Sequence, residues 1–220
     1  MTRTADSGES GRRHWESVYT EKNTAQVSWF EPTPSGSLAM LDTVGAAPSM
    51  AIIDVGAGAS RLAAALLNRG FTDITALDVA DEGLAVARRE LGSDADKITC
   101  VTADLLTWSP NRRFDIWHDR AVFHFLTTPE QQRRYLQTAH TALQPDARLI
   151  IATFAEDGPQ QCSGLPVARY SSSQLVDTLN AHSETAFKLL GHRREEHRTP
   201  WGATQPFTWV AVGYQGQRPT

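Results

Sequence analysis

A short apolar run followed by a glycine turn constrains the fold of this chain more than any other stretch. In AIIDVGAGASRLAAALL (residues 51–67), a β-branched pair predicts a buried parallel strand, which Asp54 ends. Gly56 and Gly58 then permit a tight turn because they lack a Cβ, leucines follow at helical spacing, and Gly70 ends the helix. Such a turn presents backbone N–H groups to a ligand, which favours a site for a nucleoside-bearing molecule.

Strand and helix patterns continue to alternate along the chain. Apolar runs typical of strands lie at residues 73–79, 98–105, 114–118 and 148–154. Helical patterns lie between them at residues 81–91 and 128–143, and the second begins with Thr128 as N-cap before a proline. This alternation predicts an α/β fold with a doubly wound, mostly parallel sheet.

Three of the predicted strands end in an aspartate. Asp54, Asp78 and Asp104 follow consecutive strands, and parallel strands place their carboxyl ends at one edge of the sheet. An acid at Asp78 accepts hydrogen bonds from both hydroxyls of a ribose, and one at Asp104 meets the amino group of an adenine. The alternative interpretation is that each aspartate only caps the helix that follows.

The last part of the chain breaks the alternation. After a helix near residues 172–180, two strand-like runs at 186–195 and 207–212 are separated by a connection with proline and glycine. We expect them to form an antiparallel hairpin, which brings the predicted sheet to seven strands. A fold built from two dinucleotide-binding halves does not end in this way.

An aromatic segment precedes the first predicted strand. Trp15, Tyr19, Trp29 and Phe30 are so dense that they need burial, either as helical turns packed on the main domain or as a lid that covers a ligand. The two interpretations are compatible. We divide the chain into a disordered tail (residues 1–13), an N-terminal helical aromatic cap (14–47) and a main domain (48–216).

The composition limits the classes of function. A net charge of −4 and a pI near 6.0 give no electrostatic case for nucleic acid as the main partner. Two isolated cysteines indicate neither a disulfide framework nor a zinc site, so we expect a cytoplasmic protein with no metal. No apolar run approaches the ~20 residues of a membrane span. Cations that are nearly all arginine and segments rich in alanine indicate a bacterial source.

The motif Asp-x-Gly-x-Gly-x-Ser at residues 54–60 resembles the first motif of class I S-adenosylmethionine-dependent methyltransferases, whose Rossmann-like sheet also ends in a hairpin. The resemblance implies S-adenosyl-L-methionine as the cofactor. It implies that the cofactor is bound by Trp15, Trp29, Asp54, Gly56, Gly58, Asp78, Val79, Asp104, Leu105, His118 and Arg120.

A second resemblance is more specific. FDIWHDRAVFHFL (residues 114–126), the pair Arg134–Tyr135, and CSGLPV (162–167) with Tyr170 are similar to the thiopurine and thiol S-methyltransferase group. That similarity implies a small-molecule acceptor, with a thiol or other soft nucleophile slightly favoured. The candidate catalytic residues are His118, Arg120, His124 and Tyr170, and His197 is a further candidate base.

Arg120 has three interpretations: it neutralises the carboxylate of the cofactor, orients an anionic acceptor, or forms a salt bridge with Asp119. Cys162 either contacts a soft substrate or is an inert buried thiol.

Other functions stay open at this point. A protein lysine N-methyltransferase and a non-catalytic module that binds S-adenosylmethionine and regulates a partner are both compatible with the same motifs. An NAD-dependent dehydrogenase is disfavoured, because Arg61 stands where the dinucleotide fingerprint needs its third glycine. The oligomeric state is not predicted.

Overall fold

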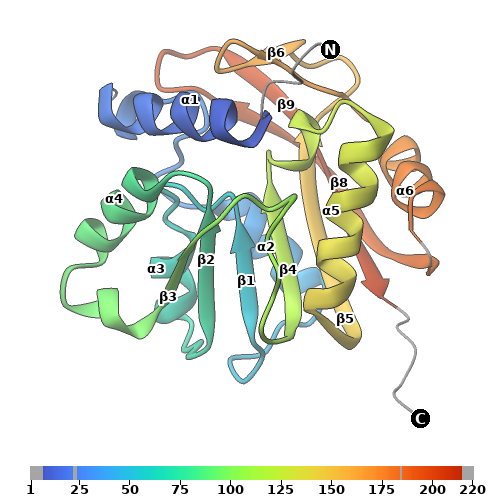
Figure 1. Cartoon of the computed structure of the whole chain (residues 1–220), viewed down its shortest axis with the longest axis horizontal. Helices are drawn as coiled ribbons and strands as arrows, with labels where there is room; N and C mark the ends of the chain where they lie inside the picture. Colours follow the sequence, from blue (N-terminus) through green and yellow to red (C-terminus); the bar gives the residue numbers. More distant parts are fainter. Residues whose placement is uncertain (1–6, 22–23, 184, 215–220) are drawn as a thin grey trace, which may run out of the picture.

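A seven-stranded sheet forms the centre of the computed structural model, which describes residues 7–21, 24–183 and 185–214 (Figure 1). In spatial order its strands are β3 (Thr99–Thr102), β2 (Ile74–Asp78), β1 (Ile52–Val55), β4 (Phe114–Arg120), β5 (Leu143–Phe154), β9 (Thr204–Tyr214) and β8 (Phe187–Arg198). The pairs from β3 to β5 are parallel, whereas β9 is antiparallel to both β5 and β8. The predicted fold class and terminal hairpin are therefore confirmed.

Helices cover both faces of the sheet. One face packs against α2 (Ser35–Thr43), α3 (Leu62–Asn68) and α4 (Asp81–Leu91), and the other against α5 (Pro129–Ala142) and α6 (Ser172–Ala181). Short 3-10 turns lie at η1 (Thr24–Gln26), η2 (Gly92–Lys97) and η3 (Phe123–Phe125). A small separate hairpin pairs β6 (Gln161–Cys162) with β7 (Leu165–Pro166).

Burial of β1 on both faces of the sheet explains why its sequence begins with consecutive apolar residues. Ile52 belongs to the core cluster that includes Leu62 of α3, and its neighbour Ile53 belongs to the cluster that includes Leu136 of α5. Both isoleucines are fully buried, as expected for a parallel strand between two helical layers. The predicted start of α5 is also confirmed, because Thr128 and Gln131 form a reciprocal capping box.

Helix α1 (Ser7–Glu21) lies above the carboxyl ends of β1 and β2, across the top of the sheet in Figure 1. The prediction of a disordered tail is wrong for residues 7–13, which form the first part of this helix, and residues 1–6 lie outside the described residues. The polar sequence gave no amphipathic signal there. This polar segment is helical because it continues the aromatic part of α1 towards the N-terminus, and the ion pair between Arg12 and Glu16, one turn apart, supports the helix.

Strand β4 runs two residues further than expected, so that Asp119 and Arg120 belong to the strand and not to the loop after it. Among the described residues, no helix is both long and apolar enough to cross a bilayer.

Candidate functional site

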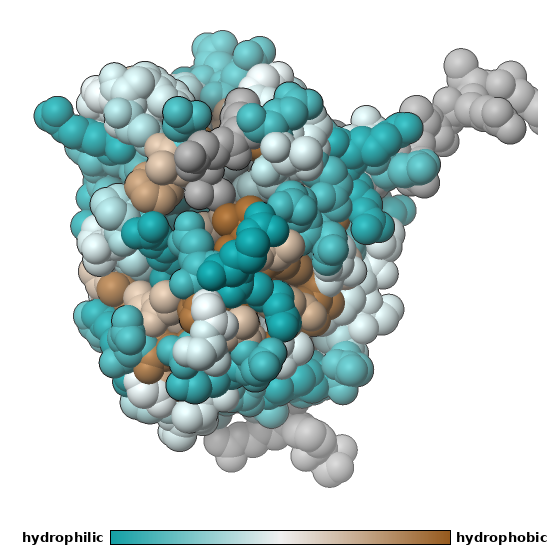
Figure 2. Space-filling model, turned by 90° about the vertical axis from the view of Figure 1, so that its left-hand side faces the viewer, coloured by the Kyte–Doolittle hydropathy of each residue, from teal (hydrophilic) through white to brown (hydrophobic). Residues whose placement is uncertain are grey.

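A cavity of about 540 Å³ lies where the parallel strands end, between the sheet edge and α1. Every parallel strand or the loop after it contributes to its wall, and so do α1 and β9. The contributing residues include Trp15, Tyr19, Trp29, Gly56, Asp78, Val79, Asp104, Leu105, Arg120, Val122 and Phe207. Figure 2 shows the side of the molecule that carries α1 and α4, where hydrophobic side chains are visible between hydrophilic ones.

The glycine turn after β1 contributes Gly56 to the wall of the larger cavity, and its backbone conformation requires glycine. Gly56 and Gly58 have φ values of 65° and 46°, in the left-handed region that side chains disfavour. A Cβ on Gly58 would collide with the hydroxyl of Tyr19, and a Cβ on Gly56 would collide with Val122. The absence of these side chains therefore lets Tyr19 of α1 pack against Gly58 and lets Val122, just after β4, pack against Gly56.

Asp78 is the most constrained carboxylate of the cavity. It is only 6% exposed, its Oδ2 accepts the N–H of Gly58 at 2.8 Å, and its Oδ1 accepts the N–H of Ala80 at 2.8 Å. Burial raises the pKa of Asp78 from 3.8 to about 6 despite these donors. Each carboxylate oxygen keeps a further lone pair for a hydroxyl donor in the cavity.

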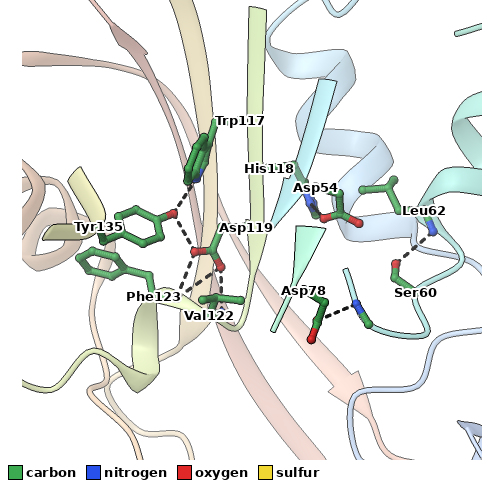
Figure 3. A network of polar contacts seen from close by, with 11 residues as sticks. Asp54, Ser60, Leu62, Asp78, Trp117, His118, Asp119, Val122, Phe123 and Tyr135 are labelled. Atoms are coloured by element: carbon green, nitrogen blue, oxygen red, sulfur yellow. Dashed lines mark hydrogen bonds and ion pairs between the residues drawn. The ribbon is translucent and has the colours of Figure 1, made fainter. Parts of the chain in front are cut away.

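Asp54 and His118 form a buried pair at the point where the strand order reverses. They are register partners on β1 and β4, and Asp54 Oδ1 lies 2.7 Å from His118 Nδ1 (Figure 3). The carboxylate fixes the proton on Nδ1, which leaves the buried Nε2 of His118 without a hydrogen-bond partner among the described residues. Both side chains line a second cavity of about 60 Å³, and Gly56, Trp29 and Arg120 line both cavities.

Asp104 serves its own turn as well as the cavity. Its Oδ1 accepts the N–H of Leu106 at 2.9 Å in an Asx-type turn, and the next described element after β3 is β4 and not a helix, so this side chain caps no helix. Asp104, Leu105 and Leu106 nevertheless all line the larger cavity. The helix-capping alternative is therefore wrong for Asp104.

Arg120 is held by the cap and not by its neighbour in sequence. Its Nη1 donates to the carbonyl of Trp29 at 3.1 Å, its Nη2 lies 3.1 Å from Glu31 Oε1, and the guanidinium stacks on Phe207 at 4.9 Å. Of the three interpretations given for Arg120, the salt bridge with Asp119 is therefore wrong. The contact with Glu31 lacks hydrogen-bond geometry, so Nε and Nη2 of Arg120 are buried donors without a partner in the described part of the chain.

Asp119 instead supports the turn that borders the cavity. This fully buried carboxylate accepts the N–H groups of Val122 and Phe123 at 2.8 and 3.1 Å and the hydroxyl of Tyr135 at 2.7 Å (Figure 3). Burial raises the pKa of Asp119 to about 7. The turn also contains Ala121 at φ 73°, a strained conformation that the surrounding contacts maintain.

His124 and Tyr170, two of the predicted catalytic residues, are not among the described residues that line either cavity. His124 is buried behind the rings of Phe125 and Phe154, and burial lowers its pKa to about 3. Tyr170 accepts a hydrogen bond from Gln132 at 3.0 Å, in the core beside Phe123.

His197 is also absent from the residues that line the two cavities. Its Nε2 donates to the carbonyl of Ser28 at 2.6 Å, and its Nδ1 faces Glu31 at 3.5 Å. Cys162 does line the larger cavity, and burial raises the pKa of its thiol to about 11.

Several lining residues gave no signal in the sequence. His14 lines the cavity from α1, while Gln205 and Phe207 line it from β9, about 190 residues further along the chain. Spacing within one element predicts which face is buried, but the approach of distant elements is set by tertiary packing. His14 alone offered a local cue, because it adjoins Trp15 in the aromatic cap. The described residues contain no group of three or more acidic, histidine or cysteine side chains placed to hold a metal ion.

Comparison with known proteins identifies the central part of the chain. Residues 52–146 match the sequence profile of a family described as "Methyltransferase domain". This part of the chain is a methyltransferase domain. Over 79 residues the chain is 33% identical to thiocyanate methyltransferase 1 of Brassica oleracea, a match that covers 35% of this chain and 34% of that protein. The chain therefore matches only about a third of the length of this curated relative.

Solved structures extend the likeness over nearly the whole chain. One, described as the conversion of a disulfide bond into a thioacetal group during echinomycin biosynthesis, has a TM-score of 0.73 at 20% identity and covers 94% of both chains. The 1,6-didemethyltoxoflavin N1-methyltransferase of Burkholderia thailandensis, solved with S-adenosylhomocysteine, has a TM-score of 0.65 at 21% identity over 94% of this chain and 85% of that one. The class I fold expected for the methyltransferase domain is confirmed.

Proposed function

We propose that the protein is an S-adenosyl-L-methionine-dependent methyltransferase that acts on a small molecule, with a thiol or another soft nucleophile as the favoured acceptor. The observation that carries this proposal is the cavity of about 540 Å³ that joins the glycine turn to the buried carboxylate of Asp78. The family match of residues 52–146 and the relative solved with S-adenosylhomocysteine support the same cofactor.

The chemistry of the lining fits a nucleoside at one end of the cavity. Asp78 offers two oxygens with free lone pairs to the ribose hydroxyls. Val79, Leu105 and Leu106 offer apolar contact to an adenine, and Asp104 lies beside them for its amino group.

The smaller cavity fits the amino-acid part of the same cofactor. Asp54 has a carboxylate there for an ammonium group, and Arg120 has buried donors for a carboxylate. Gly56 borders both cavities, and so do Trp29 and Arg120. These assignments rest on position and on the donors and acceptors available.

When bound, S-adenosylmethionine supplies an electrophilic methyl group on a sulfonium. The task of the chain is then to hold donor and acceptor in line and to exclude water. The rings of Trp15, Phe125 and Phe207 provide apolar walls, and α1 covers the cavity. No covalent bond to the protein is needed.

The protonation states of the nearby groups favour an acceptor that reacts as its own anion. A thiol ionises close to neutral pH, so it needs no strong base. Neither His124, with a pKa near 3, nor Cys162, with a pKa near 11, suits proton removal at pH 7. The partial match to a thiocyanate methyltransferase supports this class of acceptor. An acceptor such as an amine would need a general base to remove its proton. His14 lines the cavity, and its Nε2 has no hydrogen-bond partner among the described residues, so it is the candidate for that role.

Two alternatives are separated by experiment. A protein lysine methyltransferase needs an open channel for a lysine side chain, which the cover formed by α1 disfavours. A non-catalytic binding module would bind the cofactor and yield no product. We would titrate S-adenosylhomocysteine and NAD by calorimetry and then screen thiols for methylated product. Binding of NAD alone would overturn the proposal, and binding without turnover of any small molecule would favour the module.

Binding of S-adenosylhomocysteine should weaken in mild acid. Asp78 has to be ionised to accept two hydroxyl hydrogen bonds, and its pKa of about 6 means that protons compete below that pH. We expect the dissociation constant to be about tenfold higher at pH 5 than at pH 7, and flat above pH 7. Calorimetry across this range measures it. An Asp78→Asn variant should lose the slope, and persistence of the slope in that variant would assign it to another group.

A further inference from the structure

The first turn of α4 is capped by a side chain from another helix. The N-cap position of α4 is Ala80, which has no side chain able to accept a hydrogen bond. Glu16 of α1 fills this role: its Oε1 accepts the N–H of Asp81 at 2.9 Å, and its Oε2 accepts the N–H of Glu82 at 3.2 Å. Two of the free donors of α4 thus depend on a residue 65 positions earlier in the chain.

Helix α1 covers the larger cavity through one of its faces. Ser10, Gly11, His14, Trp15 and Tyr19 line the cavity at helical spacing. Glu16 lies beside this face and holds α1 against α4, which in turn packs on the sheet. The capping contact is therefore a polar attachment of α1 to the body of the domain.

The fit of Tyr19 supports the same docked position. Its ring would meet a Cβ on Gly83 of α4 at 2.9 Å, so this glycine lets the ring lie against the helix backbone. Its hydroxyl lies over Gly58 in the glycine turn. Burial raises the pKa of Tyr19 well above its ordinary value, which keeps the side chain neutral in this position.

The capping contact also adjoins the residue that we assign to the ribose. Asp78 accepts the N–H of Ala80, and Glu16 accepts the next two N–H groups along the same turn. Three consecutive backbone donors are thus shared between the strand-end carboxylate and the cover.

The charges around Glu16 do not prevent this arrangement. Arg12 lies 3.8 Å from it on α1. The two acids of the α4 turn have partners of their own, because Asp81 accepts from Thr102 and Glu82 accepts from Arg89.

We propose that Glu16 is a positioning residue that latches α1 over the cavity and sets the rate at which the cofactor product leaves. The inference rests on the proposed function only for the identity of the ligand. Opening of α1 must release Glu16 from Asp81 and Glu82, so loss of this carboxylate favours the open position.

The test compares Glu16→Ala with Glu21→Ala in the same helix. Glu21 accepts a hydrogen bond from Ser17 within α1. Its replacement by alanine removes the same charge as Glu16→Ala, which makes Glu21→Ala a matched control. Hydrogen exchange of the Asp81 and Glu82 amides is measured in the ligand-free protein. Stopped-flow tryptophan fluorescence then measures dissociation of S-adenosylhomocysteine.

In Glu16→Ala we expect both exchange and dissociation to be about fivefold faster, the factor that corresponds to one helix cap of ~1 kcal/mol. Glu16→Gln should be intermediate, since its amide oxygen still accepts one N–H. Unchanged amide exchange would overturn the contact, and faster exchange with an unchanged dissociation rate would overturn its role as a latch. If the wild type bound no S-adenosylhomocysteine, the proposed function would fail, while the exchange experiment would still decide whether Glu16 holds the cover.

Discussion

Replacement of Asp78 by alanine should weaken the binding of S-adenosylhomocysteine by about 100-fold, because two hydrogen bonds to a charged acceptor contribute ~3 kcal/mol together. Asp78 lies at the carboxyl end of β2 and lines the larger cavity. Isothermal calorimetry at pH 7.5 measures the dissociation constant. The loss should appear in affinity and not in stoichiometry.

Folding of this variant is expected to survive, which separates binding from structure. Because burial raises the pKa of Asp78 to about 6, its ionised form opposes folding at pH 7, and removal of that cost offsets the loss of two backbone partners. Asp42→Ala is a suitable control, since Asp42 is exposed in an ion pair with Arg69 away from the cavity. An Asp78→Ala affinity within threefold of the wild type would exclude the ribose assignment.

Asp119→Ala should lower the free energy of unfolding by about 3 kcal/mol near pH 5, because it leaves buried donors unsatisfied at ~1–3 kcal/mol each. Those donors are the N–H groups of Val122 and Phe123 and the hydroxyl of Tyr135. Tyr135 also accepts from the indole of Trp117 at 2.8 Å, so the whole buried network depends on the carboxylate. Urea denaturation measures the loss.

The effect of Asp119→Ala should depend on pH with a definite sign. The pKa of Asp119 is about 7 in the folded protein and 3.8 unfolded, so its contribution to stability is greatest at low pH and declines as pH rises towards 7. The difference between wild type and variant should therefore be smaller at pH 8 than at pH 5. Tyr135→Phe, which keeps the ring, should cost less than Asp119→Ala. A loss below 1 kcal/mol at pH 5 would show that water satisfies the turn.

The order of strands and helices was readable from the sequence because it depends on local patterns. Ile52 and Ile53 indicated a strand buried on both faces, and Thr128 with Gln131 marked the start of α5. The prediction failed at residues 7–13, where a polar segment is helical as the first part of α1, continuous with the aromatic part of the same helix. The local propensity of the polar residues does not record this continuity.

The sequence predicted the residues that line the cavities only where those residues stand at the ends of strands. Asp54, Asp78 and Asp104 were placed at one edge by parallel topology alone, and two of them line the larger cavity while Asp54 lines the smaller. By contrast, His124 follows β4 in sequence and yet lies behind Phe125, because the 3-10 turn at η3 directs it into the core. Its role as a base stays a prediction that this burial does not favour.

The partners of the aromatic cap have a consequence for how the chain folds during synthesis. Ser28 and Glu31 contact His197 of β8, and Arg120, which donates to Trp29, stacks on Phe207 of β9. A ribosome synthesises the cap before these two strands, so Ser28 docks only when a partner about 170 residues later in the chain has been made. Such distant pairing slows folding, and it means that a nascent chain can enclose the cavity only after the terminal hairpin has joined the sheet.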